Sequence, residues 1–420
     1  MAVYLFATLD TKADEAVFVR DELNRLGVST VLVDTGCLGE ARARADVPRA
    51  ELFAAAGVSL EDVRARGDRG EAVTLASKGA EALARRAFEE ERLDGVLGIG
   101  GGAGSTIGTA AMRALPIGVP KLMVSTLASG QVAHFVGVKD VMMLNAVVDI
   151  AGLNRISRVV LARAAQAMAG MAKSGRAESR ELASGGEDKP LVAASMFGVT
   201  TPCVERARAV LEAAGYEVLV FHATGSGGKT LESLVESGLI AGVLDITTTE
   251  LADELVGGYL TAGPERLTAA TRAGVPQVVS VGALDMVNFH GPETVPAKFA
   301  GRTLYKHNAN VTLMRTTPEE CRELGREIGR KLAAASECAA LYFPLRGVSA
   351  IDREGQPFDS PAAREALLEG LEETRGATPL VALDAHINDP EFATAAAERL
   401  IALMAAQVRQ RPQPNASNRP

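Results

Sequence analysis

A glycine-rich loop at Gly98–Gly104 has the residue types that bind phosphate. It holds five glycines in seven residues, follows the mostly apolar run Leu93–Leu97 and precedes a small-residue helical stretch, Ile107–Leu115. A strand, a glycine loop and a helix in this order leave backbone N–H groups unpaired at the positive end of the helix dipole. Glycine lets such a loop take positive φ and lets a ligand approach the backbone. We therefore predict a bound phosphate or other anion, with a ligand-free turn as the alternative; the expected contacts are Gly100, Gly101, Gly102, Gly104, Ser105 and Thr106.

A second loop of similar chemistry follows the predicted strand Tyr216–Phe221. Its sequence, ATGSGGKT from Ala223 to Thr230, matches a relaxed phosphate-loop pattern in which alanine replaces the first glycine. In that mechanism backbone N–H groups hold the phosphates, the lysine supplies a charge and the threonine contacts a magnesium ion. A glycine turn with a solvated lysine would look the same, so either loop could hold the phosphate. The expected contacts here are Gly225, Ser226, Gly227, Gly228, Lys229 and Thr230.

Four side chains beyond the linker are candidates for acid–base chemistry. Asp245 and Glu250 stand where the first half has its glycine loop, His290 follows the predicted strand Gln277–Val281, and His307 lies in a polar cluster. Carboxylates and imidazoles at such positions can move protons to and from a substrate. The alternatives are a helix cap at Thr249 for the acidic segment and structural histidines. We predict no metal ligands.

Apolar runs alternate with helical patterns along the whole chain, as in doubly wound α/β folds. Val3–Leu9, Val28–Val33, Val96–Ile99 and Lys121–Ser125 read as buried parallel strands, separated by amphipathic helices. Ligands of such sheets bind beyond the carboxyl ends of the strands. The polar residues expected to line a cleft there are Asp10, Thr11, Lys12, Ser125, Thr126, Ser129, Thr247 and Thr248.

The second half of the chain repeats the order of signals in the first half. Gly27 corresponds to Gly215, Gly95-Val96-Leu97 to Gly242-Val243-Leu244, and Gly118-Val119-Pro120 to Gly274-Val275-Pro276. An internal duplication explains three matches in one order. We expect two Rossmann-like, doubly wound parallel-sheet domains with a cleft between them: residues 1–173 and 190–408, joined by a polar linker over 174–189 and followed by a disordered tail over 409–420.

Composition narrows the class of protein. The 420 residues carry a formal net charge of -8 and no tryptophan, which argues against nucleic acid or an anionic membrane as partner. Four cysteines without paired spacing argue against a zinc site or a disulfide scaffold and fit a reducing compartment. We find no signal peptide and no apolar run of about 18 residues. The expected location is the cytoplasm.

Several of these segments together resemble a known family. Gly98–Thr106, Leu115–Thr126, Phe221–Thr230, Asp245–Glu250 and Phe289–Pro292 are similar to the UPF0261 family, the bacterial and fungal relatives of the ATP-binding inhibitory domain of the tomato mosaic virus resistance protein Tm-1. The resemblance covers almost the whole chain. It implies two Rossmann-like subdomains, nucleotide binding and self-association. It does not imply antiviral activity, which belongs to the plant protein.

Two classes of function fit these features. The first is a cytoplasmic ATP-binding protein, an enzyme of small-molecule metabolism that acts on a second substrate in the cleft, with Mg²⁺ as an optional companion of the nucleotide. The second is a non-catalytic nucleotide-sensing module that acts through a protein partner. Turnover of ATP distinguishes them. Binding of NAD is disfavoured, because no acidic residue cleanly ends a strand about 20 positions after the loop. We expect a homodimer or a higher homo-oligomer.

Overall fold

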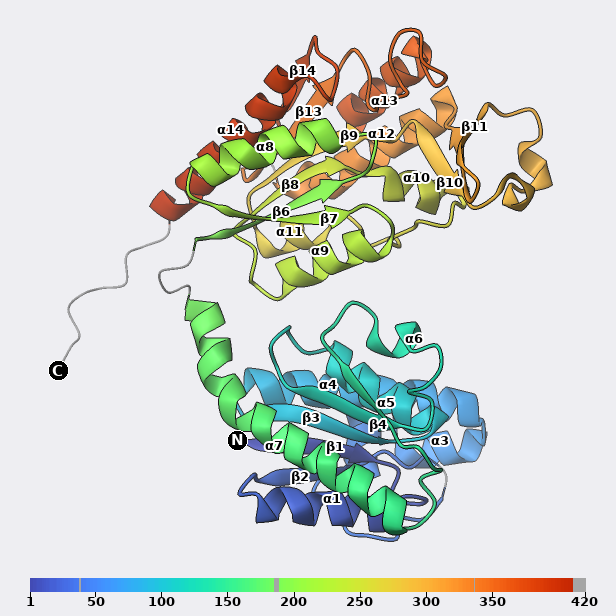
Figure 1. Ribbon diagram of the computed structural model, residues 1–420, viewed down its shortest axis with the longest axis vertical. Helices are drawn as coiled ribbons and strands as arrows, with labels where there is room; N and C mark the ends of the chain where they lie inside the picture. The colour runs from blue at the N-terminus through green and yellow to red at the C-terminus, as the bar shows by residue number, and fades with distance from the viewer. Residues whose placement is uncertain (38, 185–188, 336, 411–420) are drawn as a thin grey trace, which may run out of the picture. The chain divides into compact units, whose positions relative to one another are not determined.

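The computed structural model describes residues 1–37, 39–184, 189–335 and 337–410, and the chain divides into two compact units, Met1–Gly186 and Glu187–Pro420. Figure 1 shows each unit as a sheet covered by helices on both faces. The helix that we expected to end at Lys173 continues to Ser184, into the segment predicted as a linker. The tail predicted from residue 409 lies outside the described residues except for its first two, which end the last helix.

Unit 1, residues 1–186, is built on a five-stranded parallel sheet. Its strand order is β2-β1-β3-β4-β5, with β1 (Ala2–Ala7), β2 (Thr30–Asp34), β3 (Leu93–Gly100), β4 (Lys121–Ser125) and β5 (Met142–Asn145). Its helices are α1 (Ala13–Arg25), α2 (Arg49–Ala55), α3 (Leu60–Arg66), α4 (Arg69–Glu89), α5 (Gly102–Arg113), α6 (Ala133–Val136) and α7 (Arg155–Ser184).

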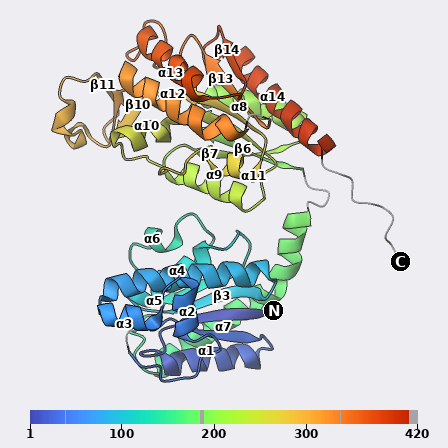
Figure 2. The ribbon, with the colours of Figure 1, turned by 180° about the vertical axis from the view of Figure 1, so that it is seen from behind.

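Alternate residues of β1 face two different cores. Val3 and Leu5 pack with α1 and α7, whereas Tyr4 and Phe6 pack with α2, α4 and α5. The views from the two sides show these helix groups on opposite faces (Figures 1 and 2). A strand that is apolar at every position is what a sheet buried on both faces requires. The prediction of a doubly wound parallel sheet is therefore confirmed.

Unit 2, residues 187–420, repeats this topology and extends it. The order of its parallel sheet is β14-β13-β9-β8-β6-β7, so β7-β6-β8-β9-β13 reproduces the strand order of unit 1 and β14 adds one edge strand. The strands are β6 (Leu191–Met196), β7 (Glu217–His222), β8 (Gly242–Thr247), β9 (Gln277–Gly282), β13 (Ala339–Pro344) and β14 (Leu380–Leu383). The repeated order supports an internal duplication.

The helices of unit 2 again cover both faces of the sheet. The buried residues of α8 and α14 form one core with β6, and those of α10, α12 and α13 form another with β9 and β13. The helices are α8 (Thr201–Ala213), α9 (Ser226–Glu236), α10 (Thr249–Val256), α11 (Ala269–Ala273), α12 (Pro318–Leu332), α13 (Pro361–Thr374) and α14 (Pro390–Gln410), with short 3-10 turns at Pro292–Thr294, Ala297–Phe299 and Ala333–Ala335.

A small antiparallel sheet is the main element that sequence analysis missed. It has the order β10-β12-β11, with β10 (Met286–Phe289), β11 (Leu304–Asn308) and β12 (Val311–Arg315). The segment around β10 reads as a loop because it is short and Asn288 interrupts its apolar residues. Pairing with β12 turns it into a buried strand.

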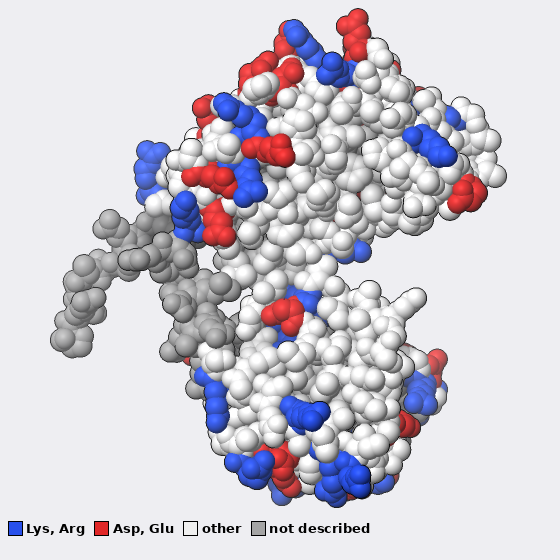
Figure 3. Space-filling view, viewed as in Figure 1, with Lys and Arg blue, Asp and Glu red and all other residues white. Residues whose placement is uncertain are grey.

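The surface has the mixed character that the composition suggests. On the face drawn in Figure 3, basic and acidic side chains alternate among the described residues of both units. Within the described ranges, no helix has the length and apolar content needed to cross a bilayer.

Candidate anion site at the glycine loop

A cavity lies at the carboxyl edge of the unit 1 sheet, where the strand order reverses. The helix after β1 covers one face of the sheet and the helix after β3 covers the other, so the adjacent strands β1 and β3 leave a crevice between their ends. This cavity has a volume of about 520 Å³, which is in the usual range for small-molecule sites. It is lined by Thr8, Asp10, Thr11, Lys12, Cys37, Gly39, Glu40, Arg69, Val73, Gly101, Gly102, Ala103 and Gly104.

The glycine loop forms one wall of this cavity and opens α5. Gly101 is the N-cap residue of α5 and has no side chain to cap the helix, and the first turn holds no acidic residue. The first N–H groups of a helix have no partner within the helix, and the helix dipole gives them a partial positive charge. The start of α5 therefore presents a positive helix end to the cavity that Gly101–Gly104 line.

Packing against the rest of the protein requires glycine at only some positions of this loop. A Cβ on Gly100 would lie 2.7 Å from the Cα of Gly104, so this close approach requires glycine. A Cβ on Gly101 would have nothing nearer than 3.5 Å and one on Gly102 nothing nearer than 3.8 Å. Our expectation of positive φ is wrong, because none of the loop glycines has it. Neither conformation nor packing thus demands glycine at Gly101 and Gly102, where a side chain would instead cover the N–H groups.

The hydroxyl groups near the loop hold it in place. Ser105 Oγ and Ser125 Oγ lie 2.6 Å apart, and the N–H of Thr126 donates to the carbonyl of Gly100 at 3.2 Å. The Thr106 hydroxyl donates to the carbonyl of Gly102 at 3.0 Å. Ser105 and Ser125 therefore join α5 to β4, whereas the exposed Thr106 bonds within α5. Ser129 lies exposed in the turn after β4.

Acidic, basic and uncharged polar side chains all line the cavity; the acidic ones are Asp10 and Glu40. Lys12 and Arg69 supply positive charge, and the Lys12 amine also donates to the carbonyl of Ile150. Thr8 and Thr11 share a hydrogen bond of 2.9 Å between their hydroxyl groups. Asp10, Thr11 and Lys12 thus lie beside the glycine loop, as the strand-end argument predicts.

Cys37 also lines the cavity, but it is not an activated nucleophile. Burial, together with the nearby Asp10 carboxylate, raises the pKa of the Cys37 thiol to about 11. The reactive form of cysteine is the thiolate, so this thiol is protonated and unreactive at neutral pH.

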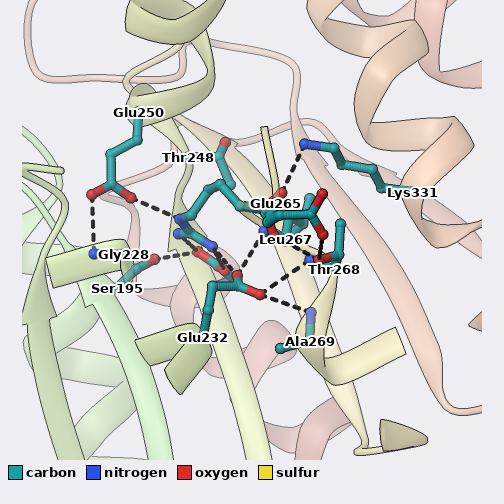
Figure 4. Close-up of polar contacts among 12 residues, drawn as sticks. Ser195, Gly228, Glu232, Thr248, Glu250, Glu265, Leu267, Thr268, Ala269 and Lys331 are labelled. Carbon is teal, nitrogen blue, oxygen red and sulfur yellow. Dashed lines mark hydrogen bonds and ion pairs between the residues drawn. The ribbon is translucent and has the colours of Figure 1, made fainter. Parts of the chain in front are cut away.

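The second predicted loop has a different structure, because a carboxylate of the chain itself fills it. Glu250 Oε1 accepts the N–H of Gly225 at 2.6 Å. It also accepts the N–H of Gly228 at 3.0 Å (Figure 4). A Cβ on Gly227 would lie 1.8 Å from the carbonyl oxygen of His222, and Gly225 has a φ of 82°. Packing and conformation thus account for these glycines. The remaining predicted contacts, Ser226, Lys229 and Thr230, lie in the first turn or so of α9, where the Thr230 hydroxyl donates to the carbonyl of Ser226.

Asp245 and Glu250, two of the predicted catalytic residues, are held by a buried arginine. Arg266 donates to both oxygens of Asp245 at 2.5 and 2.7 Å and to Glu250 Oε2 at 2.7 Å, and its side chain is fully buried. Ser195 donates to Asp245 at 2.6 Å. Burial raises the pKa of the Glu250 carboxyl, and Arg266 opposes that effect. These contacts correct the catalytic assignment: both carboxylates serve as structural partners of Arg266.

Glu232 completes this network and was not singled out in the sequence. It lies 3.2 Å from Arg266 and accepts the N–H groups of Leu267 at 2.6 Å and Ala269 at 2.7 Å, which caps α11 (Figure 4). Glu232 follows the GKT tripeptide by only two residues, but its partners lie 34 or more positions away. No local pattern reveals such pairing.

Buried threonines lie at the carboxyl end of β8 in unit 2. Thr247 Oγ1 lies 2.8 Å from Thr200 Oγ1, and the N–H of Thr247 donates to Ser195 Oγ at 2.9 Å. The Thr248 hydroxyl donates to the carbonyl of Ser280. Both predicted cleft residues, Thr247 and Thr248, are fully buried and bonded to neighbouring strands.

The two candidate histidines lie at the small antiparallel sheet of unit 2. His290 directly follows β10, is exposed and stacks against Tyr259 with ring centroids 3.8 Å apart, and His307 is exposed on β11. β10 and β11 pair with opposite edges of β12, and His307 lies at a shift in the β11–β12 register. Among the residues that the structure describes, no group of three or more His, Cys, Asp or Glu side chains is arranged to hold a metal ion.

Sequence reasoning missed the cavity wall that follows β2. Gly39, Glu40 and Arg69 lie beyond this strand, in a segment that reads as irregular. The available signal was position, since the end of β2 must share the carboxyl edge of the sheet with the ends of β1 and β3.

Both units match domain models of the same protein family. Residues 1–177 match the model described as the uncharacterised protein family UPF0261 N-terminal domain, and residues 189–404 match the corresponding C-terminal domain. A UPF0261 protein of Clostridium tetani is 49% identical over 404 residues, covering 96% of this chain and 98% of that protein.

Two tomato proteins are also similar over most of the chain. The ToMV resistance protein Tm-1(GCR237) of Solanum lycopersicum is 42% identical and the ToMV susceptible protein tm-1(GCR26) is 41% identical, each over 412 residues. The match covers 94% of this chain and 54% of each tomato protein. Because one relative is named for resistance and the other for susceptibility, the similarity does not carry resistance to this chain.

Proposed function

The chain belongs to the UPF0261 family, and on this premise we propose that unit 1 binds a nucleotide, ATP, with its phosphates at the start of α5. The observation that carries the proposal is the uncapped start of α5 on a cavity of about 520 Å³. Gly101 and Gly102 leave the N–H groups uncovered there without a packing reason of their own. Helix starts of this kind bind phosphate through N–H groups and the helix dipole.

Two basic side chains also favour a phosphate in this cavity. Arg69 and Lys12 line the cavity and favour the negative charge of a phosphate, and a divalent cation such as Mg²⁺ would accompany ATP. In unit 2 the N–H groups of the other glycine loop, those of Gly225 and Gly228, already bind Glu250. The proposal is therefore one nucleotide per chain, in unit 1.

The proposal ends at binding and assigns no reaction. Asp245 and Glu250, which we expected to act as acid or base, are bound to Arg266. This observation favours a nucleotide-sensing module over an enzyme. Release of phosphate or AMP during incubation with ATP and cell metabolites would reverse that preference.

Calorimetric titration of ATP with magnesium tests the proposal. We expect wild type and Lys229→Ala to bind alike, and the double variant Gly101→Asp/Gly102→Asp to bind roughly tenfold more weakly or not at all, because its carboxylates repel phosphate. Circular dichroism and thermal melting establish that the variants are folded. Loss of binding only in Lys229→Ala would place the nucleotide in unit 2, and no binding by wild type would end the proposal.

Three further expectations remain proposals that accompany this one. They are a second small-molecule substrate, self-association into a homodimer or larger assembly, and a cytoplasmic location. Light scattering after size-exclusion chromatography, with and without ATP, measures the second of these.

A further inference from the structure

The acidic residue at the end of β2 is bound by the protein itself. In dinucleotide-binding folds an acidic residue near the glycine loop holds the ribose hydroxyls, and Asp34 ends a strand beside the cavity although it precedes Gly98–Gly104 in the chain. Asp34 Oδ1 accepts the N–H groups of Leu9 at 3.1 Å and Gly36 at 2.9 Å, and Oδ2 accepts Arg49 Nε at 2.7 Å. Its side chain is only 3% exposed, so Asp34 is not accessible to a ligand.

A different carboxylate, that of Asp10, lines the cavity in a seat that two glycines make possible. A Cβ on Gly36 would lie 3.0 Å from Asp10 Cγ, and a Cβ on Gly39 would lie 2.8 Å from Asp10 Cβ and 3.0 Å from its Oδ2. Neither glycine has positive φ, so the backbone conformation does not require them. The loop after β2 thus leaves room for the Asp10 side chain at the cavity wall.

A buried arginine borders the same space as Asp10. A Cβ on Gly36 would lie 2.5 Å from Arg49 Nη2, which is buried and has no hydrogen-bond partner among the described residues. The charge of Arg49 is paired with Asp34, so Arg49 contributes an N–H donor beside Asp10 rather than a free positive charge.

We propose that Asp10 accepts hydrogen bonds from sugar hydroxyls of the ligand, which makes the ligand class a phosphate ester of a ribose-type diol. This inference rests on the proposed phosphate seat at α5. An ionised carboxylate only accepts. Asp10 Oδ2 accepts the N–H of Gly39 at 3.3 Å, and the remaining lone pairs of its two oxygens match the two donors of a vicinal diol. The Asp10 carboxylate repels phosphate, so the phosphate lies toward Gly101–Gly104 and the sugar toward Asp10. Inorganic polyphosphates lack this second contact.

A comparison of ATP with 2′,3′-dideoxy-ATP tests the contact. Both ligands are titrated by calorimetry into wild type, Asp10→Ala and Glu40→Ala, once with Mg²⁺ and once with EDTA. Glu40 is a matched control because its carboxylate lines the same cavity but pairs with Arg64 at 2.9 Å. We expect wild type and Glu40→Ala to bind ATP roughly tenfold more tightly than the dideoxy analogue, and Asp10→Ala to bind the two within about twofold.

The outcomes separate this inference from the proposed function. If wild type binds both nucleotides equally well, or if Asp10→Ala keeps the full preference for ATP, the sugar contact is wrong while the phosphate seat stands. If Asp10→Ala weakens both nucleotides equally and only with Mg²⁺, Asp10 holds the metal instead, and the inference is overturned. If wild type binds neither nucleotide, the proposed function itself has failed. Thermal melting of both variants shows whether they are folded.

Discussion

Glu250 Oε1 accepts the N–H of Gly225 at 2.6 Å, where a phosphate-binding loop would hold its ligand. Glu250 comes from α10 and reaches the start of α9, so the anion that this loop needs is supplied by the next β-α segment of the chain. The loop of unit 1, at the start of α5, has no such internal anion.

Removal of that anion should destabilise unit 2. In Glu250→Ala the buried Arg266 loses one carboxylate and the N–H groups of Gly225 and Gly228 lose their acceptor. Breaking a buried ion pair costs about 3–5 kcal/mol, and we expect a loss of that size in urea unfolding. Lys229→Ala, on the exposed side of the same helix, should change the free energy of unfolding by less than about 0.5 kcal/mol. Equal stabilities of the two variants would show that Glu250 does not hold the loop.

Glycine-to-alanine substitutions should separate structural from ligand-facing positions in the first loop. Gly102→Ala meets no atom nearer than 3.8 Å, so thermal melting should show unchanged or slightly raised stability. Gly100→Ala would place a methyl group 2.7 Å from Gly104 Cα, so we expect a loss of about 1–3 kcal/mol. A large loss in Gly102→Ala would mean that packing demands this glycine, which would remove the main support for a ligand there.

The free energy of unfolding should depend on pH because of the buried carboxyl group of Asp253. Burial raises the pKa of this carboxyl to about 7, from 3.8. The folded state therefore keeps a proton that the unfolded chain has released, and the contribution of Asp253 to stability is lost as the pH rises from 3.8 to about 7. Asp253→Asn is permanently neutral, so its free energy of unfolding should fall less over this range than that of wild type. Identical pH profiles in urea titrations would contradict the assignment.

The contacts of Asp253 suit a neutral side chain at position 253. Its two oxygens lie 2.8 Å from the backbone nitrogen and 2.6 Å from the amide nitrogen of Asn288, whose Oδ1 is buried without a partner. Rotation of the Asn288 amide by half a turn would let that oxygen accept a proton from Asp253. An asparagine at position 253 could make the same pair of hydrogen bonds.

Alkylation of Cys37 should report on the cavity. Because the pKa of its thiol is about 11, labelling by iodoacetamide at pH 7.5 should be slow and should accelerate about tenfold per pH unit up to pH 9. Bound ATP should slow it further, since Cys37 lines the cavity. Cys338 is the control, as it is also half-buried but lies in unit 2. Peptide mass spectrometry distinguishes the two sites, and equal effects of ATP on both would contradict a local ligand.

The sequence predicted what depends on local pattern and order. The apolar runs Val3–Leu9 and Val96–Ile99 correctly indicated strands buried on both faces, and the repeated glycines predicted two copies of one topology. Thr317 and Glu320 form the capping box that opens α12, as the spacing T-P-E-E indicates.

Contacts between distant segments were not predictable in this way. The loop at Gly225 has the pattern of a phosphate site, but whether its N–H groups are uncovered depends on Glu250, 25 residues further on. The same limit applies to Arg266, whose burial among three carboxylates follows from the fold and not from its neighbours in sequence. The role of Asp10 became visible only when the loop after β2 was placed beside it.

The internal carboxylate of unit 2 also bears on how the chain would respond to a missing ligand. The start of α9 is already bound by Glu250, so its N–H groups need no anion from outside the chain. Under the proposed function, an anion bound at the start of α5 adds to the stability of unit 1 by mass action. Unit 1 would then be the half whose resistance to proteases depends on the supply of a small molecule.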